Sequence, residues 1–153
     1  MENTNTNTNT NTNTNTNVVM NKNTEKPQKV MSKANMSRLV KDVADIYKSP
    51  LNTQGIYYVH DDEDMMTGYA MIIGPKDTPY EHGAYFFKFI FPASYPYEPP
   101  VLKYLTNDGT TRFNPNLYRN GKVCLSIVNT WHGEGWTSCQ TIRSILLSLI
   151  LVF

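Results

Sequence analysis

Four runs of β-branched and aromatic residues follow one another between residues 55 and 105, and they restrict the fold more than any other feature of the sequence. The connections between the runs are polar or rich in proline and glycine, and none carries a convincing helical pattern. Parallel neighbours would need a crossover of about a dozen residues or more, so the runs predict an antiparallel meander. The predicted strands cover residues 55–59, 69–73, 84–91 and 101–105.

A helix is predicted before these strands, packed on one face of the sheet. Asn35 or Ser37 is the expected cap, and Ser49-Pro50 is the expected stop. The apolar residues that recur at helical spacing are Leu39, Val40, Val43, Ile46 and Tyr47. The predicted fold class is therefore α+β.

A second helix is predicted after a long irregular stretch that runs from residue 107 to about residue 136. Thr137 and Gln140 fit a Thr-x-x-Gln capping box, and the run from Thr141 onward is apolar around most of its circumference. This run reaches Phe153 without a glycine, lysine or proline to end it. We interpret the sequence as cut short at this point.

Composition indicates one domain and names no charged partner. Residues 1–33, which include seven consecutive Asn-Thr dipeptides at residues 3–16, are predicted to be a disordered extension, and residues 34–153 to be the folded domain. A formal net charge of +1 gives no basic surface for nucleic acid. Two cysteines and the lack of an export signal favour a soluble protein of the cytoplasm or nucleus. The longest apolar run has 12 residues, too few to span a membrane.

Cys124 is either a buried packing residue or a nucleophile, and its position between Val123 and Leu125 does not decide between the two. A cysteine among hydrophobic residues is typical of packing. A polar loop precedes it, however, and the amide of Asn114, Asn116 or Asn120 is a neutral donor that can stabilise an oxyanion formed by thiol attack. Asn-Pro and Asn-Gly are also strong turn signals; we favour a turn for Asn120, whereas the alternatives for Asn114 and Asn116 remain open.

Other chemistries find less support in the sequence. A cysteine hydrolase would need an imidazole base, and we interpret all three histidines as solvated loop residues, although His132 remains a possible partner of Cys124. Cys124, His132 and Cys139 do not have the spacing of a zinc site. The sequence also lacks a phosphate-binding glycine loop. A thiol with an amide and no base suits an enzyme that carries an acyl group as a thioester.

Several motifs resemble those of ubiquitin-conjugating enzymes and occur in the same order. "GPKDTPYEHGAYFFKFIFPASYPYEPP" resembles the turn, third strand and proline-rich loop of that family, and "NPN" before "GKVCLSI" resembles its His-Pro-Asn motif and active-site cysteine. Phe-Asn-Pro-Asn, the run around Cys124 and a longer loop before Trp136 resemble the Z-type subgroup and the conjugating domains of large hybrid ligases. The resemblance covers residues 36–153 and implies the fold of a UBC core domain, in which two further helices would follow.

The resemblance implies roles for named residues. Cys124 would accept ubiquitin or a ubiquitin-like modifier as a thioester from an activating enzyme, which uses ATP, and Asn116 would stabilise the oxyanion or hold the active-site loop. No cofactor or metal of its own is expected. The other implied residues are Asn114, Pro115 and Ser126 in the active-site loop, and Pro96, Tyr97, Ser138 and Cys139 in the ligase-binding loops.

The sequence also departs from the family pattern. Asn114 stands where the motif has histidine, and Thr137-Ser138-Cys139 stands where Ser-Pro-Ala is usual. Substrate lysines and a ligase are the expected partners, with no nucleic acid and no membrane. The alternative is a truncated, non-catalytic module that binds ubiquitin or a ligase.

Overall fold

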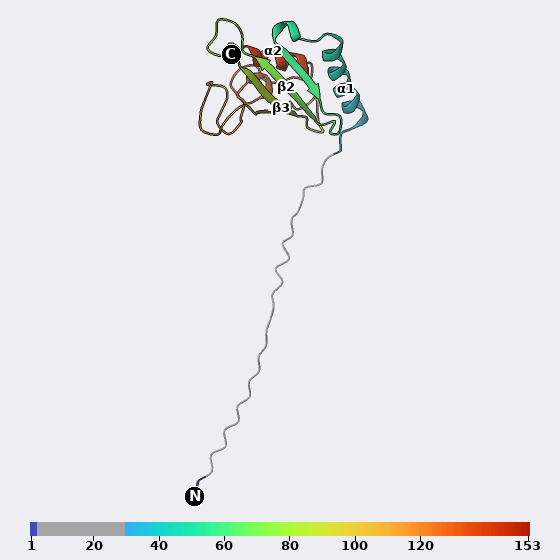
Figure 1. The fold of residues 1–153 in the computed structure, drawn as a ribbon. Helices are drawn as coiled ribbons and strands as arrows, with labels where there is room; N and C mark the ends of the chain where they lie inside the picture. Colours follow the sequence, from blue (N-terminus) through green and yellow to red (C-terminus); the bar gives the residue numbers. More distant parts are fainter. Residues whose placement is uncertain (3–29) are drawn as a thin grey trace.

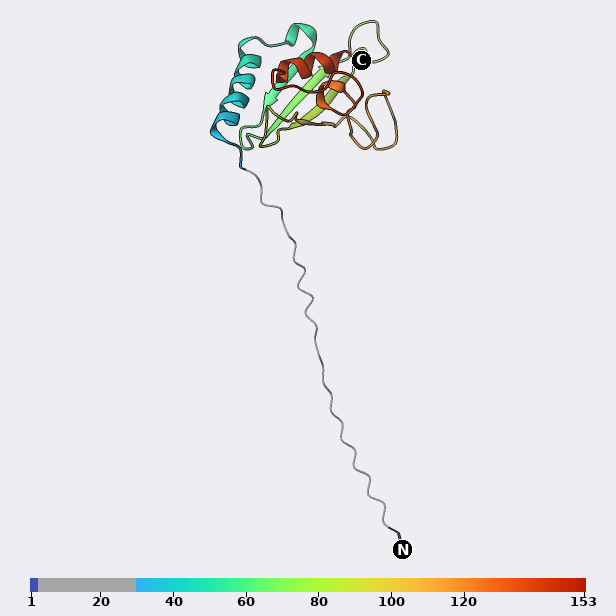
Figure 2. The same ribbon diagram turned by 180° about the vertical axis from the view of Figure 1, so that it is seen from behind.

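A computed structural model describes residues 1–2 and 30–153, and its helices and strands, from Lys33 to Ile150, form one layered fold. Most of the predicted disordered extension therefore lies outside the described residues. A four-stranded sheet forms one layer, α2 lies across one of its faces, and α1 lies beside α2 at the side of the sheet (Figures 1 and 2). The strands precede residues 105–141, and α2 follows them.

The sheet is the antiparallel meander that the sequence predicts. Its strands lie in the order β1-β2-β3-β4, each paired with its neighbour in the chain. Alternate residues of each strand face the core, as the burial pattern of β1 and β4 shows. The strand bounds are Ile56–His60 for β1, Thr67–Ile73 for β2, Ala84–Ile90 for β3 and Val101–Tyr104 for β4.

The first helix begins earlier than the sequence suggested. α1 spans Lys33–Lys48, and its cap is Ser32, whose hydroxyl accepts a hydrogen bond from the backbone N–H of Asn35. The prediction of Asn35 or Ser37 as cap is wrong, because both residues lie inside the first turns of the helix. The predicted stop is confirmed, since Ser49 is the C-cap.

The second helix, α2, spans Ile142–Ile150 and has its capping box at a different threonine. Thr141 is the N-cap, and it exchanges hydrogen bonds with Ser144. Thr137 and Gln140 do bond to each other, but they form a separate turn before the helix. The predicted capping box at Thr137 is therefore wrong, because the helix is capped at Thr141.

One continuous hydrophobic core joins the sheet and both helices. Phe87 and Phe89 from β3 and Leu146 and Leu149 from α2 are fully buried in it. The prediction that all histidines are solvated is wrong for His60. This residue ends β1 on its inward-facing side and bonds to the Tyr58 hydroxyl and the Met65 carbonyl.

The stretch from residue 105 to residue 141 contains no strand of the sheet and only one short 3₁₀ helix, η2, at Ser126–Val128. It runs from the end of β4 to the start of α2 and carries every predicted active-site residue. Over residues 1–2 and 30–153, no helix is long and apolar enough to cross a bilayer.

Candidate active site

Cys124 lies in an extended segment beside the free edge of β4. The backbone N–H of Tyr104 donates to the Gly121 carbonyl, and Lys103 pairs with Lys122 across this edge. Val123, Cys124 and Leu125 are all buried, and the residue surface of Cys124 is only 2% exposed. The thiol therefore belongs to a buried segment and is not presented at the surface.

Asn116 holds the backbone of Cys124 on both of its sides. The Cys124 N–H donates to the Asn116 carbonyl over 2.8 Å, and the Asn116 Nδ2 donates to the Cys124 carbonyl over 2.7 Å. These reciprocal bonds fix the position of Asn116 relative to the cysteine. The structure thus brings together the two residues that the sequence singled out.

Asn114 sets the conformation of the turn that contains Asn116. It is 4% exposed, and its Oδ1 accepts the backbone N–H of Asn116 at 2.7 Å. Its Nδ2 donates to the Tyr80 hydroxyl at 3.0 Å and also to the Val152 carbonyl. Asn114 thereby connects the turn to the β2–β3 connection and to the segment after α2, while Pro115 between the two asparagines is exposed.

The segment after Cys124 folds back on itself through η2. The Ser126 carbonyl accepts the N–H of Asn129, and the φ of Asn129 is +59°, a left-handed conformation that asparagine tolerates better than most residues. The Asn129 side chain then accepts the N–H of Trp136 at 2.7 Å, which closes the loop between these two residues. Gly133 in this loop faces the Ser126 side chain, since a Cβ on the glycine would lie 3.2 Å from the Ser126 Cβ.

Asn120 forms a turn, as predicted. Its side chain accepts the N–H of Lys122, and Gly121 takes a φ of +82°. The histidines, in contrast, are not brought to the thiol. His132 is exposed and meets the Trp131 ring edge-on, and among the described residues no hydrogen bond links a histidine to Cys124.

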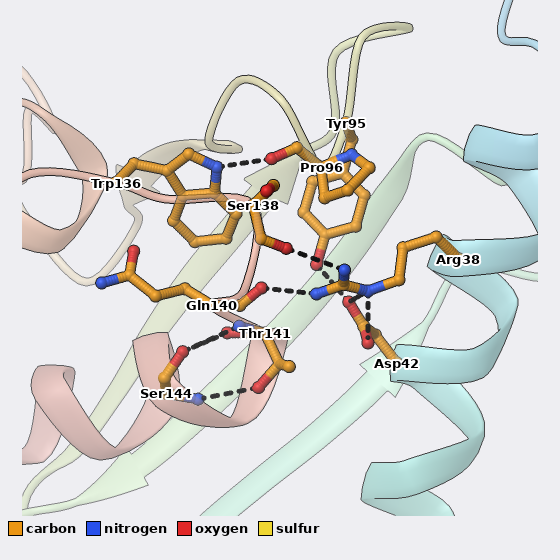
Figure 3. A network of polar contacts seen from close by, with 9 residues as sticks. All are labelled: Arg38, Asp42, Tyr95, Pro96, Trp136, Ser138, Gln140, Thr141 and Ser144. Carbon is orange, nitrogen blue, oxygen red and sulfur yellow. Dashed lines mark hydrogen bonds and ion pairs between the residues drawn. The ribbon is translucent and has the colours of Figure 1, made fainter.

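The predicted ligase-binding residues lie on two loops that Trp136 joins. The Trp136 Nε1 donates to the Pro96 carbonyl at 2.7 Å, and the indole lies 5.9 Å from the Tyr95 ring (Figure 3). Tyr97, next to Pro96, is 74% exposed. Ser138 and Cys139 are exposed on the second loop.

An ion pair in α1 supports the second of these loops. The Arg38 guanidinium bonds to the Asp42 carboxylate at 3.0 Å and to the carbonyls of Ser138 and Gln140 (Figure 3). The Tyr95 hydroxyl donates to the same carboxylate. Burial, together with this bond to Asp42, raises the pKa of Tyr95 far above its ordinary value, so the phenol remains protonated at physiological pH.

Sequence reasoning missed several of these residues. Arg38 and Asp42 carried a signal, because they are four residues apart on a helix and Asp42 falls on its apolar face. No sequence signal marked Tyr80 or Thr130, because their hydrogen-bond partners come close only when the loops are folded.

The family model for "Ubiquitin-conjugating enzyme" matches residues 38–153 of this sequence. The curated "Ubiquitin-conjugating enzyme E2 Z" of Xenopus tropicalis is 48% identical over 113 residues, which cover 73% of this chain and 36% of that protein. Its human counterpart is 49% identical over 113 residues, covering 73% and 31%. The human "Dual E2 ubiquitin-conjugating enzyme/E3 ubiquitin-protein ligase BIRC6" is 41% identical over 131 residues, covering 79% of this chain and 3% of that protein.

A solved structure agrees with these relatives. The human ubiquitin-conjugating enzyme E2 G1 aligns with a TM-score of 0.67 and 32% identity, over 78% of this chain and 93% of that chain. This chain spans about a third of the length of the E2 Z relatives. The resemblance and the fold that the motifs implied are confirmed.

Proposed function

The chain belongs to the ubiquitin-conjugating enzyme family, and we propose on this basis that it carries ubiquitin, or a ubiquitin-like modifier, as a thioester on Cys124. The observation that carries the proposal is the reciprocal pair of hydrogen bonds between Asn116 and Cys124. These bonds hold the Asn116 amide against the backbone of the residue that carries the thiol. An amide near a nucleophile supports acyl transfer, because it stabilises the oxyanion of the tetrahedral intermediate.

The proposed reaction has two acyl transfers. The Cys124 thiolate attacks the thioester carbonyl of a charged activating enzyme, and the activating-enzyme cysteine leaves as a thiolate. A substrate lysine amine then attacks the new thioester, an amide bond forms, Cys124 leaves as a thiolate, and the amine proton passes to solvent. The chain needs no cofactor or metal of its own, since the activating enzyme uses the ATP.

Asn116 is proposed to act in both transfers. Its Nδ2 carries two hydrogens, and the Cys124 carbonyl takes one of them. The second is available to the oxyanion, while the first keeps the amide beside the reacting carbon. Asn114 and Pro115 shape this turn, and Ser126 begins the backbone that leads away from the thiol.

The ligase is proposed to bind the two loops that Trp136 joins, through Pro96 and Tyr97 on one loop and Ser138 and Cys139 on the other. The exposure of Tyr97 supports this assignment, because an exposed aromatic side chain is typical of an interface anchor. The cytoplasm and nucleus, which keep a thiol such as Cys124 reduced, are the proposed compartments.

A second candidate is a non-catalytic module of the same fold that binds ubiquitin or a ligase. The 2% exposure of Cys124 favours it, since a thiol must be reached before it can be acylated. In the catalytic proposal, local movement around Cys124 has to uncover the thiol.

A thioester assay separates the two candidates. The purified chain is incubated with an activating enzyme, ATP and ubiquitin, then resolved with and without reductant. We expect a reductant-labile adduct that disappears in Cys124→Ser and persists in Cys139→Ser, the matched control with an exposed free thiol. Absence of an adduct with several activating enzymes, from a chain shown to be folded, would overturn the catalytic proposal in favour of the binding module.

A further inference from the structure

Thr130 occupies both main-chain polar groups of Leu125, the residue that follows the proposed nucleophile. The Leu125 N–H donates to the Thr130 Oγ1 at 2.8 Å, and the same hydroxyl donates to the Leu125 carbonyl at 3.0 Å. The Thr130 N–H adds a third bond, at 3.1 Å to that carbonyl. A single surface hydroxyl therefore ties down the peptide groups on both sides of the Leu125 Cα.

These bonds complement those that Asn116 makes on the other side. Asn116 holds the N–H and the carbonyl of Cys124, and Thr130 holds the N–H and the carbonyl of Leu125. Asn116 and Thr130 thus bond to four consecutive main-chain polar groups, from the Cys124 N–H to the Leu125 carbonyl, and the Val128 N–H also donates to that carbonyl, at 3.3 Å. The backbone that carries the thiol cannot rotate without breaking one of the two sets.

Thr130 is not present for packing. It is exposed and belongs neither to the hydrophobic core nor to the side chains packed against it. Its γ-methyl therefore replaces no core group, and its hydroxyl is the part of the side chain that the neighbouring backbone uses. Valine has the same shape without the hydroxyl, and serine keeps the hydroxyl without the methyl.

We infer that Thr130 is a positioning residue for Cys124, an inference that rests on the proposed thioester chemistry. Thr130 acts through the Leu125 backbone, and it fixes the direction in which the Cys124 thiol meets an incoming carbonyl. A misplacement of about 1 Å can lower the rate of a positioned reaction by about 10²-fold. Removal of the Thr130 hydroxyl should displace the Cys124 backbone in this way without unfolding the chain.

The test compares Thr130→Val with Thr130→Ser in a Cys139→Ser background, where Cys124 is the only thiol. Thr106→Val is the matched control, because the Thr106 hydroxyl also accepts a backbone N–H, from Phe86 of β3 at 2.7 Å, but makes no hydrogen bond to Cys124 or Leu125. Melting curves establish that each variant is folded; if Thr130→Val does not fold, Thr130→Ala takes its place. Two rates are then measured. The first is the single-turnover rate of thioester formation at a series of concentrations of charged activating enzyme, and the second is the rate of Cys124 alkylation by iodoacetamide.

For Thr130→Val we expect the maximal rate of thioester formation to fall about 10-fold, with the half-saturating concentration unchanged. Alkylation should become several-fold faster, since a looser backbone exposes a thiol that is now 2% exposed. Thr130→Ser and Thr106→Val should stay within about twofold of the parent in both rates, whatever Thr106→Val does to the melting temperature.

Two results would overturn the inference: a Thr130→Val rate equal to that of the parent, or a Thr130→Ser rate as low as that of Thr130→Val, which would assign the effect to the methyl group. If the parent itself forms no adduct, the proposed function fails, and alkylation alone decides the inference about Thr130. Faster alkylation in Thr130→Val but not in Thr130→Ser would still support it, and equal alkylation rates would refute it.

Discussion

Two regions of the molecule are stabilised in different ways. The periodic core, which we define as α1, β1–β4 and α2, buries apolar side chains such as Phe89 and Leu149 completely. The active-site stretch, residues 105–141, has a few buried apolar anchors, but its conformation depends on bonds from asparagine and threonine side chains to the backbone. Burial of apolar side chains thus stabilises the periodic core, whereas hydrogen bonds from side chains position the backbone of the active-site stretch.

This difference separates stability from activity. A loss in the core should lower the free energy of unfolding by several kcal/mol, because burial of apolar area is the main stabilising contribution. A lost hydrogen bond in the active-site stretch should cost about 1 kcal/mol in stability, yet should strongly change the rate at which the thiol reacts. The following variants test this contrast, from the largest expected change in unfolding free energy to the smallest.

Leu149→Ala should destabilise the fold by about 2–5 kcal/mol, because Leu149 is 0% exposed and its removal leaves a cavity between α2 and the sheet. Leu147→Ala on the same helix is the control, since Leu147 is 40% exposed, and it should cost less than about 1 kcal/mol. Urea unfolding at pH 7 measures both. Equal losses would show that α2 does not pack as described.

Asp42→Asn should cost about 1.5–3 kcal/mol, because the buried carboxylate accepts bonds from both Arg38 and Tyr95. Asp45→Asn, on the same helix, removes a carboxylate that is 58% exposed and should cost at most about 1 kcal/mol. Urea unfolding again compares the two variants. A larger loss for Asp45→Asn would mean that the Arg38 network adds nothing to the attachment of the loop.

Asn116→Ala should lower the unfolding free energy by only about 0.5–1.5 kcal/mol, the net value of an ordinary hydrogen bond. The rate of thioester formation should fall by about 10² or more, since an oxyanion donor is removed. Asn120→Ala is the control, because its side chain accepts only the Lys122 N–H at an exposed turn, and its rate should match the parent. Similar rates for both variants would contradict the role proposed for Asn116.

Tyr104→Phe should leave stability unchanged or raise it by up to about 1 kcal/mol. Within the described residues, the Tyr104 hydroxyl is buried without a hydrogen-bond partner, and burial raises its pKa to about 12. Tyr80→Phe removes a hydroxyl that bonds to Asn114 and to the Phe113 carbonyl, so it should cost about 0.5–1.5 kcal/mol. Thermal melts of the two variants should shift in opposite directions or by clearly unequal amounts; a matching loss for Tyr104→Phe would mean that its hydroxyl has a partner in solution.

The periodic core was predictable because its signals are local and repeated. Runs of β-branched and aromatic residues predicted all four strands to within two residues at each end, and the lack of crossover helices predicted their order. His60 escaped this prediction because it directly precedes a polar loop, although Ile56, Tyr58 and His60 all face inward along β1.

The errors at the helix starts have a common cause. Thr137 and Thr141 each precede a polar residue by three positions, and both pairs do form hydrogen bonds. Only the backbone conformation decides which pair begins the helix. Ser32 was likewise one of several residues able to cap α1.

In the active-site stretch, the sequence predicted functional residues only where recognisable motifs occur. Cys124 and its neighbouring asparagines were singled out from the local sequence, the resemblance selected Asn116 among them, and the structure brings Asn116 and Cys124 into contact. The bonds of Thr130 and Tyr80 depend on loops whose path no short pattern specifies. Local sequence gives the donors and acceptors of such a region but not their pairing.

Trp136 also gives the molecule an optical label. The chain contains two tryptophans, and Trp131 is exposed, whereas Trp136 is partly buried and bonded to the Pro96 carbonyl. In a Trp131→Phe variant, all indole emission would come from the junction of the two loops to which a ligase is proposed to bind. Docking of a ligase on either side of that junction would then change the emission wavelength or intensity, so its affinity could be titrated without attaching a dye.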